Sequence, residues 1–384
     1  MFTKKDKIVT MKIVVASDSF KGTLSSLDIC RLFQDELAKF PYIQAAYLPI
    51  ADGGEGSLEA IAYSLKGRYV SILTKDPYFR DIETKYYLDE ERNAYIETAS
   101  CAGLTLIDNL NPTKTTTYGL GQQVLDAINQ GCKKVYIFLG GSATNDGGCG
   151  LFSVLGTKFF NDKNEEFIPV GGTLKDIARI DNSLASRLLQ DVEIIGMCDV
   201  DNPMHGSRGA AYVYAPQKGA DEKMVSALDQ GLQNLDEIIK TDLQKSISKI
   251  KGSGAAGGIG AGILAFGNGV LHSGIKTILD LVDFDNVVKN ADYVITGEGK
   301  LDEQSFSGKA VRGIAERCQK QNIKLILVVG NTAISLKKAQ KMYSCIENII
   351  ETNANHLPYE KIVTQASQMY ILAIHELLAS ISKL

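Results

Sequence analysis

Short apolar runs alternate with helical stripes at both ends of the chain. Near the N-terminus, residues 12–16 and 43–50 predict buried strands. A helix with a broad apolar stripe is expected after the first strand, as far as about Lys39, and a second helix is expected at about 57–65. The same alternation returns near the C-terminus. The strands predicted there span residues 291–296, 324–329 and 346–350, and the helices span residues 309–321, 334–342 and 358–381. Alternating strands and helices of this kind predict a parallel sheet.

The middle of the chain has a different pattern. Segments 68–74, 83–89 and 94–98 alternate apolar and polar residues, as twisted strands near a sheet edge do. Further on, the pattern predicts helices at about 119–130, 148–155 and 221–241, and strands at 133–139 and 192–197. Residues 252–262 are about half glycine and lead into an apolar helix.

Since the two ends resemble each other and the middle does not, two α/β domains are expected in this chain of 384 residues. Residues 1–70 and 286–384 are predicted to form a doubly wound, Rossmann-like parallel-sheet domain. Residues 71–285 are predicted to form an inserted second α/β domain. A ligand cleft between the two domains is the expected active site.

Composition excludes several kinds of protein. The net charge of −4 argues against a nucleic-acid-binding surface, and no run of 18 apolar residues predicts a membrane helix. The first ten residues lack the apolar core of a signal peptide. Seven scattered cysteines contain no C-x-x-C pair, which favours a reducing cytoplasm over a disulfide framework or a zinc site.

Glycine and acidic residues gather in five patches, most of them directly after a predicted strand. The patches are residues 18–22, 51–56, 140–148, 198–203 and 296–302. In open α/β sheets, ligands bind beyond the carboxyl ends of the strands. Glycine there lets backbone N–H groups approach an anion, and carboxylates can hold Mg²⁺ or accept a proton. The pattern therefore predicts an enzyme that acts on a small phosphorylated or anionic substrate.

Three residues in the first two patches are candidates for catalysis. Lys21 stands between an acid and a glycine, where it could clamp a phosphoryl or carboxylate group. Asp18 or Asp52 could orient a substrate hydroxyl and accept its proton. For Asp52, the alternative is that it caps the helix that follows.

The 140–148 patch frames four polar residues with two glycines on each side. Its backbone could wrap phosphates while its side chains reach a metal ion. Lys309 lies close to a predicted helix start, where a cation is unfavourable unless an anion binds there. Residues 252–257 match G-x-G-x-x-G, but the polar segment before them is no strand, which argues against a dinucleotide site. These glycines could serve an anion or tight packing, and both readings stay open.

Two other segments also have two readings. Residues 199–202 could form a turn before Pro203 or a ligand cluster. The hydroxyls of residues 115–118 could bind a phosphate or belong to the start of a helix.

Taken together, these segments resemble the bacterial glycerate kinase family, type I, over most of the chain. The motifs that carry the resemblance are DSFKGTLSS (18–26), ADGGEGS (51–57), NPTKTTTYGLG (111–121), GGSATNDGGCG (140–150), CDVDNPMHG (198–206), APQKGA (215–220), GAAGGIGAG (254–262) and TGEGKLDEQ (296–304). Small departures are Ser17 in place of a frequent proline, Ser57 in place of threonine, and Met204-His205 in place of Leu-Cys.

The resemblance implies ATP-dependent phosphorylation of D-glycerate, with the 2-hydroxyl as the favoured acceptor. Mg²⁺ is expected as the metal ion, and the sequence leaves open whether the protein is a monomer or a homodimer. The rival hypotheses are a glycerate 3-kinase, a kinase of another small hydroxy acid, and a sensor that binds an acid metabolite without catalysis. Candidate substrate-binding residues are Ser19, Gly53, Gly54, Glu55, Asp199 and Asn202. Candidate ATP-binding residues are Gly140, Gly141, Ser142, Thr144, Asn145, Gly257, Gly258, Gly297 and Lys309. Candidate metal ligands are Asp146, Glu298 and Asp302.

Overall fold

The chain divides into two compact units in the computed structural model, which describes residues 11–54, 56–306 and 308–382. Unit 1 takes its residues from Met1–Asp52, Glu59–Leu65 and Ile275–Leu384, and unit 2 from Gly53–Leu58 and Lys66–Gly274. The sequence-based domain boundaries, at residues 70/71 and 285/286, lie slightly further along the chain. The cleft expected between the domains stays a prediction.

Unit 1 is built on a parallel sheet whose strand order is β16-β14-β12-β1-β2. The strands are β1 (Met11–Val15), β2 (Ile43–Tyr47), β12 (Tyr293–Thr296), β14 (Lys324–Val329) and β16 (Ile346–Glu351). Numbered along the chain, this is the doubly wound order 2-1-3-4-5, and the connections reverse direction between β1 and β12. The predicted doubly wound α/β fold is confirmed, and its topological switch point lies at these two central strands.

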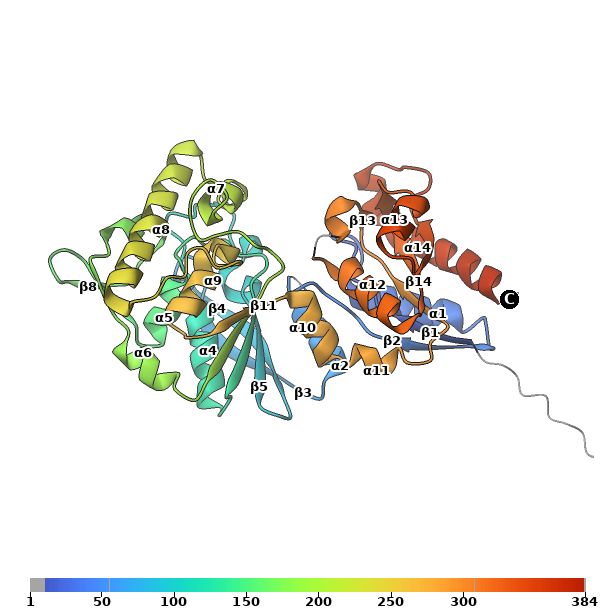
Figure 1. Ribbon diagram of the computed structural model, residues 1–384, viewed down its shortest axis with the longest axis horizontal. Helices are drawn as coiled ribbons and strands as arrows, with labels where there is room; N and C mark the ends of the chain where they lie inside the picture. The colour runs from blue at the N-terminus through green and yellow to red at the C-terminus, as the bar shows by residue number, and fades with distance from the viewer. Residues whose placement is uncertain (1–10, 55, 307, 383–384) are drawn as a thin grey trace, which may run out of the picture. The chain divides into compact units, whose positions relative to one another are not determined.

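Helices α1 (Ser26–Leu37) and α14 (Tyr359–Ile381) share a hydrophobic core with this sheet (Figure 1). Helix α1 begins at a capping box, in which the Ser25 hydroxyl accepts from the Asp28 amide and the Asp28 carboxylate accepts from the Ser25 amide. The unit also contains α11 (Phe284–Val287), α12 (Ala310–Gln321), α13 (Leu336–Met342), most of α2 (Ser57–Ser64) and α10 (Gly274–Leu281), the short strands β13 (Lys300–Leu301) and β15 (Asn331–Thr332), and the 3₁₀ turn Glu303–Phe306.

Unit 2 contains a six-stranded mixed sheet in the order β11-β10-β6-β5-β4-β3. The strands are β3 (Gly67–Lys75), β4 (Asp81–Asp89), β5 (Asn93–Glu97), β6 (Lys134–Phe138), β10 (Glu193–Met197) and β11 (Val270–His272). Strands β5, β6, β10 and β11 run parallel, whereas β3 and β4 form an antiparallel hairpin at one edge. The three alternating segments predicted between residues 68 and 98 are the strands β3 to β5.

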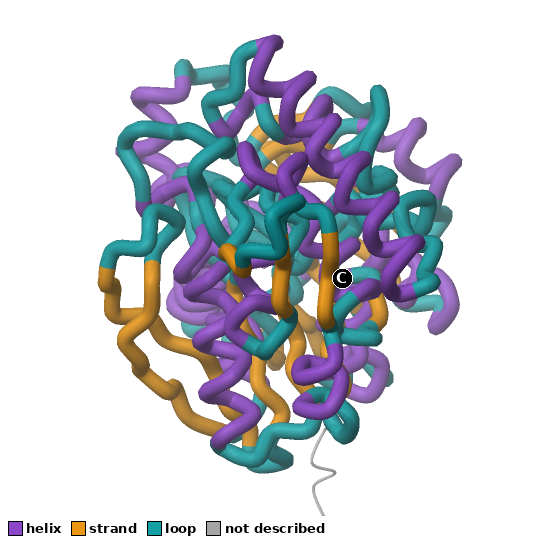
Figure 2. Tube along the Cα trace, turned by 90° about the vertical axis from the view of Figure 1, so that its left-hand side faces the viewer, coloured by secondary structure: helices purple, strands orange, loops and turns teal. Residues whose placement is uncertain are grey.

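Most helices of unit 2 contribute side chains to one large hydrophobic core with this sheet. Figure 2 draws the helices in purple and the strands in orange. The helices of this unit come from several parts of the chain. They are α3 (Ala99–Ala102), α4 (Tyr118–Asn129), α5 (Cys149–Val154), α6 (Ser183–Leu188), α7 (Ala210–Tyr214), α8 (Glu222–Leu243) and α9 (Ala255–Ala265), with 3₁₀ turns at Leu104–Leu106, Gly171–Asp176 and Pro216–Lys218. A small antiparallel sheet of β7 (Lys158–Phe160), β8 (Glu166–Phe167) and β9 (Arg179–Asp181) was not predicted from the sequence.

Among the described residues, no helix combines the length and the apolar character that crossing a bilayer requires.

Candidate active site

Three carboxylates of unit 1 lie at the carboxyl ends of neighbouring strands. Asp18 follows β1, Asp52 follows β2 and Glu298 follows β12. Burial, together with the negative charges of Asp52 and Glu298, raises the pKa of Asp18 from 3.8 to about 8. At neutral pH a group with this pKa is mostly protonated, and its ionised fraction is a stronger base than an ordinary aspartate, which suits that fraction to general-base chemistry.

Backbone contacts hold the Asp18 and Glu298 loops together. The Asp18 amide and the Ser17 hydroxyl both donate to the Gly297 carbonyl, each at 3.2 Å. Only glycine fits at position 297, because a Cβ there would lie 1.6 Å from the Val328 carbonyl oxygen. These contacts fix the two carboxylates at the switch point of the sheet.

Glu298 is a buried carboxylate with one unpartnered oxygen. Burial raises its pKa, and the Lys309 ammonium, 3.8 Å from its Oε2, opposes the shift. Its Oε1 has no hydrogen-bond partner among the described residues. A buried carboxylate oxygen in this state is suited to a proton or a cation. Lys309 lies just before α12, as expected from the sequence, and the charged group near its ammonium is the Glu298 carboxylate of the same unit.

The other candidates of unit 1 lie in the same loops, after β1 and β12. Ser19 donates its amide to Asp18 Oδ1 at 2.6 Å. Asp302 accepts from the Gln304 amide at 2.9 Å and lies 4.0 Å from the Lys300 ammonium. Lys21 is exposed. Residue Glu55 lies outside the described residues.

In unit 2, Asp146 is fully buried and organises the loop 140–148. Its carboxylate accepts the Thr117 amide and hydroxyl, both at 2.8 Å, and the amides of Gly148 and Gly150 at 3.1 and 3.2 Å. Burial raises the pKa of Asp146, and these hydrogen bonds oppose the shift. With both oxygens occupied in this way, Asp146 ties the loop to the start of α4 and is poorly placed as a metal ligand. The Thr117 hydroxyl is likewise used inside the protein.

A lysine to which the sequence assigned no role lies beneath the same loop. Lys218 is 2% exposed, and its Nζ donates to Ser142 Oγ at 2.8 Å and to the Thr144 carbonyl at 2.6 Å. Burial lowers its pKa to about 7, and the charge of Asp146 opposes the shift. Next to these contacts, Thr144 Oγ1 and both polar atoms of the Asn145 amide are buried without a partner among the described residues. The only sequence signal for Lys218 is its place in the APQKGA motif.

The glycines of α9 allow it to approach this loop. Ala256, Gly257 and Gly258 have left-handed backbone conformations with φ of 54°, 71° and 90°. A Cβ at Gly257 would lie 1.9 Å from the Thr144 carbonyl oxygen, so glycine is required there. The Gly147 amide also donates to the Gly257 carbonyl at 3.1 Å. The contact shown is therefore tight backbone packing, one of the two uses expected for these glycines.

The remaining candidates of unit 2 lie at the carboxyl ends of β6 and β10. Gly140 contacts the backbone of Gly53 and Gly54, since a Cβ on Gly140 would lie 2.5 Å from the Gly54 Cα. Asp199 accepts from the Ser273 hydroxyl at 2.6 Å. Asn202 donates to the Arg208 carbonyl and accepts from the Tyr214 hydroxyl, so its amide holds the 202–214 turn together.

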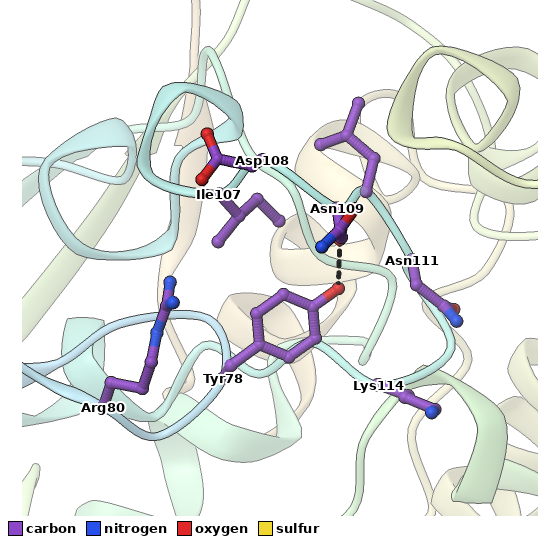
Figure 3. Close-up of a pocket in the computed structure, with 8 residues that line it drawn as sticks. Tyr78, Arg80, Ile107, Asp108, Asn109, Asn111 and Lys114 are labelled. Atoms are coloured by element: carbon purple, nitrogen blue, oxygen red, sulfur yellow. Dashed lines mark hydrogen bonds between the residues drawn. The ribbon is translucent and has the colours of Figure 1, made fainter.

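A separate pocket of about 530 Å³ lies in unit 2 (Figure 3). The ring of Tyr78 lies in its middle, between Arg80 and Lys114, and the Tyr78 hydroxyl donates to the Asn109 carbonyl at 2.6 Å. The Arg80 Nε already donates to the buried Asp76 carboxylate at 2.6 Å. None of the predicted site residues lines this pocket.

Within residues 11–54, 56–306 and 308–382, no group of three His, Cys, Asp or Glu side chains is arranged to hold a metal ion. The predicted metal ligands are also divided between the units, because Asp146 belongs to unit 2 and Glu298 and Asp302 belong to unit 1.

The doubly wound sheet with carboxylates at its switch point defines an α/β enzyme that handles a small polar substrate. Comparison with known proteins identifies the family. The model of the glycerate kinase family matches residues 13–382. The chain belongs to the glycerate kinase family, whose members phosphorylate an alcohol group, and is an enzyme of this kind.

Individual relatives agree with this assignment. The chain is 41% identical over 327 residues to a glycerate kinase from Bacillus cereus (strain ATCC 10987 / NRS 248), covering 84% of this chain and 86% of the relative. It is 35% identical over 325 residues to a glycerate 2-kinase from Escherichia coli (strain K12), covering 84% and 85%. A crystal structure described as glycerate kinase 2 from Salmonella typhimurium LT2 matches with a TM-score of 0.84 and 32% identity, over 97% of this chain and 99% of that chain. The resemblance inferred from the motifs is thereby confirmed.

Proposed function

We propose that the protein transfers the γ-phosphoryl group of ATP to D-glycerate, at the 2-hydroxyl, with the help of Mg²⁺. The observation that carries this proposal is the group of carboxylates at the switch point, with Glu298 buried, Asp18 and Asp52 partly buried, and the pKa of Asp18 raised. A kinase that acts on an alcohol needs a residue to orient the hydroxyl and take its proton. The choice of the 2-hydroxyl is supported by the similarity to the relative named glycerate 2-kinase.

In this proposal, Asp18 is the general base, and Asp52 is its alternative. Asp18 is the stronger candidate because its pKa is raised to about 8, so its carboxylate is a stronger base than an ordinary aspartate. The negative charge of Asp52 contributes to this shift. Ser19 and the Gly53–Gly54 loop are proposed to orient the glycerate, and Asp199 and Asn202 to shape the loops near the ends of β6 and β10.

Lys21 is proposed to clamp a negatively charged group of the substrates, since phosphoryl transfer depends mainly on positioning and on neutralising charge. Its exposure leaves its ammonium accessible to a ligand. The nucleotide phosphates are assigned to the loop 140–148 and the α9 glycines, with Gly297 and Lys309 as further candidates.

The residues of unit 1 fit a magnesium ion that arrives with ATP. Protein-bound Mg²⁺ is usually held by one or two carboxylates, with substrate phosphates and water completing the shell. The unpartnered Oε1 of Glu298 offers one such ligand, and Asp302 is a second candidate. The ion would supply positive charge that offsets the charge developing on the phosphates.

The product formed from D-glycerate and Mg-ATP tests the proposal directly. ³¹P NMR of the product, with authentic 2- and 3-phosphoglycerate as references, is expected to show 2-phosphoglycerate. A 3-phosphoglycerate signal would overturn the choice of hydroxyl. A panel of longer sugar acids, followed by coupled detection of ADP, identifies a different acceptor. Calorimetric binding of glycerate with no ADP formed in Mg-ATP would support a sensor instead.

A further inference from the structure

Lys218 is a buried cation for which neither the motifs nor the proposed chemistry provides a role. An ammonium group that loses its water must find other partners, because burying an isolated charge is costly. In the part of the chain that the structure describes, Lys218 has two hydrogen-bond acceptors, Ser142 Oγ and the Thr144 carbonyl, and neither is a carboxylate. A neutral amine has two N–H groups and is satisfied by these partners, whereas an ammonium group has a third.

Both partners belong to the loop assigned to the nucleotide phosphates. They are separated from Lys218 by more than 70 residues along the chain. Gly219, the next residue, contacts the backbone of Leu110, because a Cβ there would lie 2.3 Å from the Leu110 carbonyl oxygen. The backbone next to Lys218 is therefore packed against Leu110, while the Lys218 amine contacts the loop through Ser142 Oγ and the Thr144 carbonyl.

Unpartnered polar atoms on this loop point independently to a ligand. Thr144 Oγ1, Asn145 Nδ2 and Asn145 Oδ1 are all buried without a hydrogen bond among the described residues. Nearly all buried polar side-chain atoms in proteins are paired, and leaving one unpaired costs free energy. Three such atoms within two consecutive residues, beside a buried lysine, are expected where a polar ligand completes the hydrogen bonds. Gly140 and Gly141, at the start of the same loop, are accessible to solvent.

We infer that Lys218 is a positioning residue for the nucleotide phosphates: it fixes Ser142 and the Thr144 backbone from beneath the loop and supplies a buried positive charge that favours the polyphosphate. This inference rests on the proposed use of the loop by ATP. The charge acts strongly because little water screens it. Lys218 is therefore expected to affect the affinity for ATP and not the choice of the hydroxyl that is phosphorylated.

The pocket shown in Figure 3 is the rival anion site in unit 2. Its Arg80 is already paired with Asp76, and its Lys114 is exposed, where water and salt weaken its attraction for an anion. The 140–148 loop is the better candidate for binding an anion, because the Lys218 amine and the unpartnered atoms of Thr144 and Asn145 are all buried.

The first experiment compares ATP and adenosine binding to folded variants by calorimetry. Lys218→Met is expected to weaken ATP binding by about ten- to a hundredfold, as the loss of a charge-assisted contact does. Adenosine, which has no phosphates, is expected to bind within about twofold of wild type. In steady state, KM for ATP rises and KM for glycerate stays the same. Lys114→Met, the control for the rival pocket, is expected to leave the ATP affinity unchanged.

Equal ATP affinity in Lys218→Met and wild type would overturn the inference, as would a loss of affinity confined to Lys114→Met. An equal loss for ATP and adenosine would show that the lysine only supports the fold. A coupled assay of wild type with D-glycerate separates the two proposals. If wild type forms ADP and Lys218→Met binds ATP normally, only this inference fails. If wild type forms no ADP while ATP binding depends on Lys218, only the proposed function fails.

A second measurement does not require the lysine variant to fold. Burial lowers the pKa of Lys218 to about 7, and Asp146 is the ionisable group whose charge acts on it. At pH 8 the Lys218 amine is mostly neutral, so binding of a polyphosphate is expected to be accompanied by uptake of a proton. At pH 6 the amine is already charged, and the proton uptake is expected to be much smaller. Calorimetry in buffers of different ionisation enthalpy measures this uptake. It is measured in Asp18→Asn, because Asp18 titrates in the same range. Proton uptake that is absent at pH 8 would contradict the inference.

Discussion

The two units differ in the ionisable groups of their candidate sites: carboxylates follow the strands of unit 1, whereas in unit 2 a buried lysine contacts the 140–148 loop, whose Asp146 carboxylate is fully hydrogen-bonded. Unit 1 brings together Asp18, Asp52 and Glu298, and burial with mutual repulsion raises the pKa of Asp18 and Glu298. Unit 2 buries Lys218 under a glycine-rich loop, and burial lowers its pKa. In both cases the shift favours the neutral form near pH 7. The sign of the buried group indicates the ligand it is suited to: a proton or a cation in unit 1, and an anion in unit 2.

The largest expected effect tests the acidic group of unit 1. Asp18→Asn removes the proposed base and is expected to lower kcat/KM for glycerate by about 10²- to 10⁴-fold. Steady-state kinetics with coupled ADP detection measures the loss. Asp35→Asn, an exposed residue of α1, is the matched control and should retain full activity. A larger loss in Asp52→Asn than in Asp18→Asn would transfer the role to Asp52.

The next effect concerns the acidic residue of unit 2. Asp146→Asn is expected to lower the free energy of unfolding by about 1–3 kcal/mol, because an amide NH₂ group cannot accept the hydrogen bonds that the carboxylate accepts. Urea unfolding measures it, with the exposed Asp191→Asn as the control. If the free energy of unfolding is unchanged and the Mg²⁺ concentration needed for half-maximal activity rises instead, Asp146 is a metal ligand.

Lys21→Met is expected to reduce kcat/KM by about tenfold, since it removes the cation proposed to stabilise the transferring phosphoryl group. The exposed Lys320→Met, at the end of α12, serves as a control for general charge loss in unit 1. Near-normal kcat/KM in Lys21→Met would rule out the clamp and leave Lys309, 3.8 Å from Glu298, as the remaining candidate cation of unit 1.

The smallest effect is on stability and its dependence on pH. The folded protein holds the Asp18 proton up to about pH 8, whereas the unfolded chain releases it near pH 3.8. Wild type therefore loses stability as pH rises between these values, and Asp18→Asn does not. The variant is expected to have a Tm roughly 5 °C above wild type at pH 8, with a smaller difference at pH 5. A difference that shrinks with rising pH would contradict the raised pKa.

The fold was largely predictable because hydrophobic periodicity follows the local backbone. Both ends of the chain alternate long strands and helices, and the predicted segments lie within a few residues of β1, β12, β14 and α12. The small sheet β8-β7-β9 was not predicted, because strands of two or three residues are too short to show a period.

The candidate site was predictable only where topology determines it. Asp18, Asp52 and Glu298 follow strands of one parallel sheet, so their proximity follows from the strand pattern. Lys218 depends on a contact across more than 70 residues, and nothing in its local sequence distinguishes a buried lysine from an exposed one. Asp146 was recognised as a loop carboxylate, but its four donors could not be read from the sequence.

The strand order of unit 1 has a consequence for the order of events during synthesis. β1 must pair with β12, and the register joins Ile13 to Tyr293 and Val15 to Ile295. The ribosome therefore releases the whole of unit 2 before β12 exists, so unit 2 can fold as the chain emerges while β1 has only β2 to pair with. Completion of the sheet then depends on a late, long-range pairing, during which the edge of β1 that will bind β12 stays open to other strands.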